Sequence, residues 1–232
     1  MATRVPVLAA LAAMLVMLAG CRQDRMVASP PNFAPPTVRL PGPIKLPDEG
    51  TPERQKMQQQ AQITAVPSND RLLAGAALTP KVKARAWEYI IIHHSDTAYG
   101  CALRFHKAHI ARGWDMLGYD FVIGNGTESR DGAIEVGPRW IQQLDGAHTG
   151  TPDHRFNEKG IGICLVGNFD ESQPTAAQMD SLARLVAYMM KTYNIPAGRV
   201  LGHRDCKSTN CPGRYMDINL VRNLANAYLA KQ

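Results

Sequence analysis

The sequence predicts an α/β fold, a single domain with a central mixed β-sheet flanked by helices. Aromatic and β-branched runs alternate with stretches of helical periodicity, an order typical of a layered α/β domain. No internal repeat interrupts this order. The chain has 232 residues, of which 45% are hydrophobic and 20% charged, a balance that excludes a wholly disordered or fibrous protein.

The predicted elements begin at about residue 82. Short runs rich in β-branched and aromatic residues favour strands at 87–92, 119–123, 133–137, 161–166 and 199–202. The second and third of these runs flank a polar turn, so we expect them to form a hairpin. Helical periodicity favours helices at 101–112, which ends before Gly113, at 174–194, and after Asp217, a suitable N-cap.

The formal net charge of +6 resides mainly outside the predicted domain. Residues 85–232 carry 16 Lys/Arg against 15 Asp/Glu, whereas residues 22–84 carry nine basic against five acidic side chains. A groove for DNA or RNA needs Lys and Arg gathered on the folded part of the chain. We therefore expect no nucleic-acid partner.

The first 20 residues have the pattern of a signal peptide. Residues 5–19 are apolar and uncharged, which is too short for a membrane-spanning helix but suits a secretory signal. The run Leu18-Ala19-Gly20-Cys21 resembles the lipobox of bacterial lipoproteins, so we expect Cys21 to be lipidated. A plain secretory signal is the alternative. Because residue 22 is Arg rather than Asp, we expect a lipid anchor on the periplasmic side of the outer membrane rather than the inner one.

Residues 21–81 are expected to form a flexible tether between this anchor and a domain at 82–232. Residues 22–80 hold ten of the chain's 16 prolines, and their apolar residues follow no sustained period. Such a segment buries too little surface to offset the entropy of ordering it. A short helix around residues 52–63 remains compatible with this interpretation.

Two apolar runs that end in histidine predict a metal site. The first run ends in His93 and His94, and the second ends in His203, which Cys211 follows eight residues later. Two histidines and a cysteine leave one tetrahedral position open for water, as in catalytic zinc sites. From spacing alone, Cys206 and Cys211 could instead form a disulfide or serve as two ligands of a structural zinc.

Five segments carry a resemblance to a known family. They are Ile-His-His-Ser at 92–95, Gly-Trp-Asp-Met-Leu-Gly-Tyr-Asp-Phe at 113–121, Gly-Ala-His-Thr at 146–149, Gly-Ile-Gly-Ile-Cys-Leu-Val-Gly-Asn-Phe at 160–169, and Gly-His-Arg-Asp to Cys-Pro-Gly at 202–213. In this order they resemble the zinc-dependent N-acetylmuramoyl-L-alanine amidases of type 2, which share a domain with the peptidoglycan recognition proteins. The resemblance covers about residues 85–225 and implies that family's fold.

The resemblance also implies the metal ligands and the reaction. By motif match, one Zn²⁺ would be held by His93, His203 and Cys211, with His94 as a neighbour. The implied reaction is hydrolysis of the amide bond between N-acetylmuramic acid and L-alanine in peptidoglycan. Peptidoglycan is therefore the expected partner, together with the membrane through the lipid anchor, and we expect a monomer.

Four further residues match functional positions of the family. Tyr119 falls on the catalytic tyrosine, and Thr209 lies where relatives carry Thr or Lys. His148 matches a histidine of the substrate cleft, and Asn157 matches a polar residue of the same wall. Taken alone, Tyr119 is better explained as a strand aromatic that packs on the core, and only the resemblance implies a catalytic role.

Two alternatives to the hydrolase stay open at this point. A recognition module would bind peptidoglycan without cutting it, although Cys211 argues against this because a receptor needs no third zinc ligand. A structural zinc domain would use Cys206 as a fourth ligand and close the site to water. Cys164 is expected in a buried strand, and the sequence leaves open whether Cys101 and Cys206 form a disulfide.

Overall fold

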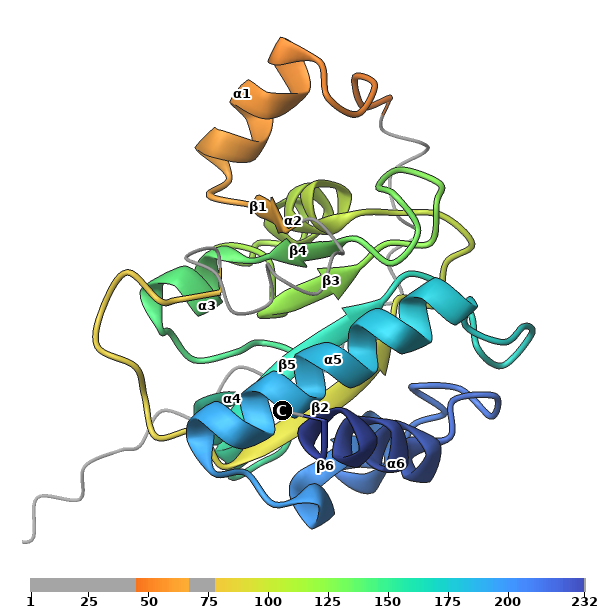
Figure 1. Cartoon of the computed structure of the whole chain (residues 1–232). Helices are drawn as coiled ribbons and strands as arrows, with labels where there is room; N and C mark the ends of the chain where they lie inside the picture. The colour runs from red at the N-terminus through yellow and green to blue at the C-terminus, as the bar shows by residue number, and fades with distance from the viewer. Residues whose placement is uncertain (1–44, 67–77, 232) are drawn as a thin grey trace, which may run out of the picture. The chain divides into compact units, whose positions relative to one another are not determined.

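The computed structural model of the chain describes residues 45–66 and 78–231, so the leader and Cys21 lie outside the described residues. In chain order the elements are α1 (Pro52–Gln60), β1 (Thr64–Val66), β2 (Tyr89–His94), α2 (Ala102–Ala111), β3 (Phe121–Ile123), β4 (Ile134–Val136), α3 (Pro138–Gln142), α4 (Arg155–Lys159), β5 (Gly160–Leu165), α5 (Ala176–Tyr193), η1 (Ala197–Arg199), β6 (Val200–Gly202), η2 (His203–Asp205) and α6 (Ile218–Leu229) (Figure 1). Within these residues, every helix is too short or too polar to cross a membrane.

The six strands form one mixed sheet in the order β1-β4-β3-β5-β2-β6. The strand β2 runs parallel to both β5 and β6, and β3 runs parallel to β5. The strand β4 pairs antiparallel with β3 as the predicted hairpin, and β1 adds antiparallel to the other side of β4. This arrangement confirms the predicted α/β fold with a central mixed sheet.

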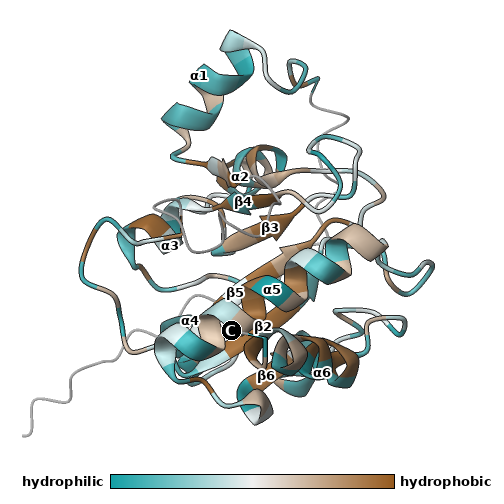
Figure 2. Cartoon of the chain, in the orientation of Figure 1, coloured by the Kyte–Doolittle hydropathy of each residue, from teal (hydrophilic) through white to brown (hydrophobic). Residues whose placement is uncertain are grey.

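Each face of the sheet packs against its own layer of helices. The helices α5 and α6 lie on one face (Figure 1). They bury apolar side chains against alternate residues of β2, β3 and β5, among them Ile90 and Ile92. On the other face, α2 packs against Val122 of β3 and Cys164 of β5. The central strands are hydrophobic along most of their length, whereas α1 is mostly hydrophilic (Figure 2). Because side chains of a strand alternate between faces, successive residues of β2 lie in different layers.

The predicted helices and strands are all present, with ends shifted by one or two residues. The helix α5 begins at a capping box, in which Thr175 and Gln178 satisfy each other's backbone N–H groups. The sequence did not predict α3, α4 or β1. Helices of five residues and a strand of three are too short to show a period.

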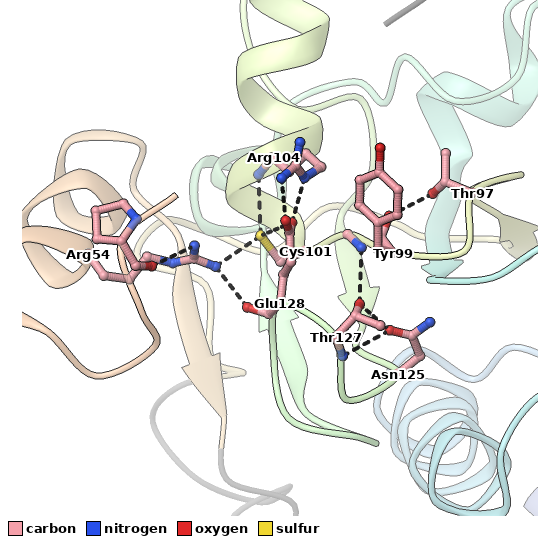
Figure 3. A network of polar contacts seen from close by, with 10 residues as sticks. Arg54, Thr97, Tyr99, Cys101, Arg104, Asn125, Thr127 and Glu128 are labelled. Carbon is pink, nitrogen blue, oxygen red and sulfur yellow. Dashed lines mark hydrogen bonds and ion pairs between the residues drawn. The ribbon is translucent and has the colours of Figure 1, made fainter. Parts of the chain in front are cut away.

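Residues 45–66 differ from the expected tether. The helix α1 lies where the sequence was compatible with a short helix, near residues 52–63. After it, Ala61, Ile63 and Val66 are buried. Arg54 lies on the buried side of α1 with 2% of its surface exposed. Its Nη2 donates to the carbonyl oxygen of Glu128 at 2.9 Å and to the sulfur of Cys101 at 3.0 Å (Figure 3).

This contact is part of a larger polar cluster at the start of α2. Cys101 is the N-cap of α2, and its sulfur accepts the backbone N–H of Arg104. The guanidinium of Arg104 forms an ion pair with the carboxylate of Glu128 (Figure 3). Glu128 therefore binds both arginines, Arg104 through its carboxylate and Arg54 through its backbone carbonyl. Together with β1, the cluster joins residues 45–66 to the domain, which the sequence had placed at 82–232.

Candidate metal centre

The predicted histidines meet because β2 and β6 are neighbouring parallel strands. Ile92 of β2 pairs with Gly202, the last residue of β6, so His93 and His203 follow at the same edge of the sheet. Their ring centroids lie 4.4 Å apart. The carboxylate of Asp205 accepts the backbone N–H of Gly202 at 2.8 Å and closes the turn that carries His203.

Alternation along β2 separates the roles of its two histidines. His94 lies on the α5/α6 side, where its Nδ1 accepts the backbone N–H of Phe169 at 3.2 Å. His93 lies on the opposite face, that of Cys164, its partner in β5. Only His93 therefore faces His203 and the rest of the cluster, which explains in physical terms why His94 is a neighbour.

Cys211 completes the cluster from the loop after η2. Its Sγ lies 3.7 Å from Nδ1 of His93 and accepts the backbone N–H of His94 at 3.4 Å. The ligand atoms of His93, His203 and Cys211 all lie within 4.8 Å of one another. Ligands of a tetrahedral zinc at about 2.0–2.3 Å from the metal are separated by roughly 3.3–3.8 Å. The three atoms are thus close to the spacing that one zinc ion needs.

The protonation of the three groups also suits a metal. Burial lowers the pKa of His203 to about 4 and holds the pKa of His93 well below its usual value, so both rings are neutral at pH 7 and offer lone pairs. Burial raises the pKa of the Cys211 thiol to about 12, so a cation is required to hold it as a thiolate. The buried Nε2 of His203 has no hydrogen-bond partner within the described part of the chain. Two neutral imidazoles and a thiolate form a donor set that fits zinc.

The other cysteines stay apart from the cluster. Cys206 is not in the group of ligand atoms, and its thiol faces the carbonyl oxygen of Gly202 at 3.8 Å. All four cysteines of the described residues carry free thiols, so Cys101 and Cys206 do not form a disulfide in this structure. Cys164 lies in a buried strand as expected. The closed, four-ligand zinc site considered from the sequence therefore lacks its fourth ligand.

Tyr119 lies beside the cluster, two residues before β3 begins. Its ring centroid lies 5.3 Å from that of His93, and the side chain is partly exposed. Burial of the hydroxyl, and to a smaller extent its contact with the Cys164 thiol, raises the pKa of Tyr119 well above its usual value. The phenol therefore keeps its proton and can donate a hydrogen bond beside the metal ligands.

Two histidines of α2 that no sequence pattern marked as functional bind the backbone of the loop just before Tyr119. Nδ1 of His106 accepts the backbone N–H of Leu117 at 3.2 Å, and Nδ1 of His109 accepts that of Gly118 at 3.0 Å. A helix pattern shows which residues share a face but not that they bind a loop eight or more residues away.

Thr209, His148 and Asn157 occupy different positions around the cluster. The hydroxyl of Thr209 accepts the backbone N–H of Cys211 at 3.3 Å and is partly exposed, so its proton can point outward. Asn157 lies in α4, where its Oδ1 accepts the backbone N–H groups of His148 and Thr149 at 3.0 and 2.9 Å. His148 is 7% exposed and contacts His93 directly, with 3.0 Å between Nε2 of His93 and Nδ1 of His148.

Comparison with known proteins places this centre in a family. The family model described as N-acetylmuramoyl-L-alanine amidase (Amidase_2) matches residues 83–214, which include the three clustered side chains. Peptidoglycan-recognition protein LB of Drosophila melanogaster is 34% identical over 138 residues, 54% of this chain and 54% of that protein, so the match spans about half of the fly protein's length. N-acetylmuramoyl-L-alanine amidase of Mus musculus is 30% identical over 149 residues, 58% of this chain and 26% of that protein.

A solved structure shares the fold at a similar level of identity. It is the N-acetylmuramoyl-L-alanine amidase LysC from Clostridium intestinale, 29% identical, with a TM-score of 0.53 over 64% of this chain and 93% of that one. The family match spans more than half of the sequence and contains every residue of the cluster. The chain therefore belongs to the Amidase_2 family, whose members include N-acetylmuramoyl-L-alanine amidases and peptidoglycan-recognition proteins.

Proposed function

We propose that this protein is a zinc-dependent hydrolase that cleaves the amide bond between N-acetylmuramic acid and L-alanine in peptidoglycan, acting as a monomer with one zinc ion. The observation that carries the proposal is the cluster of His93, His203 and Cys211 in a chain of the amidase family. Three protein ligands leave a fourth tetrahedral position open, which is the arrangement of catalytic rather than structural zinc sites.

The chemistry divides between the metal and the surrounding side chains. A zinc ion held by the three ligands would polarise the scissile carbonyl and make a water nucleophilic near neutral pH. The Tyr119 hydroxyl, which keeps its proton and whose ring lies beside His93, would donate to the oxyanion that develops on the carbonyl oxygen. The hydroxyl of Thr209 offers a second donor from the loop of Cys211.

A module that recognises peptidoglycan without cutting it is the second candidate. The similarity to the fly protein named as a peptidoglycan-recognition protein favours it. The two candidates differ in what the thiol of Cys211 does, because binding of a glycan and peptide needs no thiolate, whereas the open zinc site loses a ligand without it.

The test of the proposal therefore compares two cysteine variants of the full chain. We expect Cys211→Ser to lower the rate of peptidoglycan digestion by at least a hundredfold, measured by release of soluble muropeptides at saturating zinc. Cys206→Ser is the matched control, since this thiol lies in the same loop but outside the cluster, and it should keep the wild-type rate. Wild-type digestion by Cys211→Ser would overturn the proposed site, and binding without digestion by the wild type would favour recognition.

We further propose that the protein works at the periplasmic face of the outer membrane. The lipobox-like run that ends in Cys21 supports a lipid anchor, and the proline-rich residues before 45 supply a spacer toward the cell wall. Anchoring would raise the concentration of the domain near its substrate. Cell fractionation tests this: Cys21→Ala should move the protein from the membrane fraction to the soluble periplasmic fraction, and its retention in the membrane would contradict the anchor.

A further inference from the structure

We infer that His148 is a positioning residue that fixes the tautomer and orientation of the metal ligand His93, rather than a residue that holds substrate. The inference rests on the metal site of the proposed function but concerns metal binding itself. Its basis is a chain of hydrogen bonds that runs from a backbone carbonyl through one buried imidazole to the next.

The chain begins at the carbonyl oxygen of Gly160, the first residue of β5. Nε2 of His148 lies 3.3 Å from this oxygen, and a carbonyl oxygen can only accept, so Nε2 of His148 carries the proton. In a neutral imidazole, a proton on Nε2 leaves the lone pair on Nδ1, which makes Nδ1 of His148 an acceptor. This acceptor lies 3.0 Å from Nε2 of His93.

The donor to His148 is therefore Nε2–H of His93, which leaves the lone pair of His93 on Nδ1. That nitrogen is the one that faces Sγ of Cys211 at 3.7 Å. The opposite tautomer of His93 would set two lone pairs against each other at the Nε2–Nδ1 contact and place a proton on the nitrogen that faces the cluster. Metal-bound histidines commonly donate their second ring N–H to an outer partner, and loss of that partner typically costs 10–100-fold in metal affinity.

The surroundings of His148 hold its ring in one position. A Cβ added to Gly162 would lie 2.4 Å from Cδ2 of His148, and one added to Gly146 would lie equally close to the same atom. The imidazole therefore fits between these two backbone segments only because both residues lack a Cβ. The hydroxyl of Thr149 lies 2.9 Å from Nδ1 of His148 and shares that acceptor with His93.

Burial separates this role from substrate binding. His148 is 7% exposed, and each of its ring nitrogens already has a protein partner. A histidine that binds substrate through a hydrogen bond from its ring would need a ring nitrogen without a protein partner. The ring of His148 instead accepts a hydrogen bond from His93. It therefore affects the reaction only through the orientation of this metal ligand.

Zinc affinity of the full chain, measured by competition with a chromophoric chelator, tests the inference. We expect His148→Leu, which fills the space without an acceptor, to bind zinc 10–100-fold more weakly than the wild type. His148→Asn keeps an acceptor at the position of Nδ1 and should recover affinity to within about threefold of the wild type. Cys206→Ser is the control, because this thiol lies near His203 but outside the group of ligand atoms, and it should leave zinc affinity unchanged.

The cobalt-substituted protein gives a second readout that packing alone does not move. The visible spectrum of His148→Leu should differ from that of the wild type, and that of His148→Asn should resemble it. If His148→Leu does not fold, His148→Gln replaces it, since the longer amide keeps the donor to Gly160 but presents no acceptor at the Nδ1 position. Its affinity should fall below that of His148→Asn.

The inference is overturned if the acceptor-free variants bind zinc as tightly as the wild type, or if His148→Asn is weakened as much as His148→Leu. It is also overturned if the wild type binds no zinc. These outcomes are distinct from failure of the proposed function: a wild type that binds zinc but cuts no peptidoglycan would refute the hydrolase while leaving the role of His148 intact.

Discussion

Arg54 offers a direct test of whether residues 45–66 belong to the folded domain. Its guanidinium is buried and bonds to residues that are 47 and 74 positions away in the sequence. We expect Arg54→Ala to destabilise the protein, because the change removes these contacts along with the aliphatic part of the side chain. Lys56→Ala is the matched control, since Lys56 lies on the exposed side of the same helix.

The magnitude follows from the contacts that are lost. A hydrogen bond from a charged donor to a buried acceptor contributes about 1.5–3 kcal/mol, and burial of the aliphatic stem adds roughly 1 kcal/mol. The buried Nε of Arg54 has no partner in the described residues, so its removal returns about 1 kcal/mol. The expected loss for Arg54→Ala is therefore about 1.5–3 kcal/mol, against less than about 0.5 kcal/mol for Lys56→Ala.

Urea unfolding of the full chain in metal-free buffer measures both variants. The midpoint should fall for Arg54→Ala at an unchanged slope, because an altered slope would indicate a change in the surface exposed on unfolding. If Arg54→Ala unfolded at the same midpoint as Lys56→Ala, residues 45–66 would be a spacer after all, and the assignment of this segment to the domain would be refuted.

Three further changes probe the site and its support. Tyr119→Phe should lower the rate of peptidoglycan digestion by about 10²–10³-fold while zinc affinity stays the same, and an unchanged rate would remove the hydroxyl from the mechanism. Gly162→Ala should weaken zinc binding as measured by chelator competition, because its Cβ would displace the ring of His148; wild-type affinity would show that the ring can shift freely. Burial raises the pKa of Asp120 from 3.8 to about 7, so the folded state binds the additional proton and the wild type should lose stability relative to Asp120→Asn as the pH rises from 4 to 7, by up to about 4 kcal/mol. Urea midpoints that differ by the same amount at pH 4 and pH 8 would contradict this.

Local patterns in the sequence were sufficient for most of the fold. The strands β2 and β5 are continuous hydrophobic runs, and α5 carries a clear stripe of apolar residues, so each could be recognised without knowledge of its partners. The segment 45–66 could not, because its strand has three residues and its helix has a single buried residue, an arginine. The partners of that arginine are far away in the sequence, and composition alone favoured a spacer.

The site, like the fold, has features that the sequence predicts and features that only the packing reveals. The apolar runs that end in His93 and His203 predicted a shared metal, and the parallel pairing of β2 with β6 confirms that the two histidines meet. The choice of His93 over His94 required knowledge of which face of the sheet carries the cluster. The contact between His148 and His93 arises from the packing of a loop under β2, which no spacing in the sequence encodes.

Mass spectrometry of peptidoglycan treated with the full chain tests the central claim most directly. The digest is analysed for the zinc-loaded protein, for the protein after a chelator has removed the metal, and after zinc has been restored. We expect free stem peptides with an exposed L-alanine amine in the first sample, none in the second, and their return in the third. Intact peptidoglycan in all three samples, or products that persist without metal, would contradict a zinc-dependent amidase built on His93, His203 and Cys211.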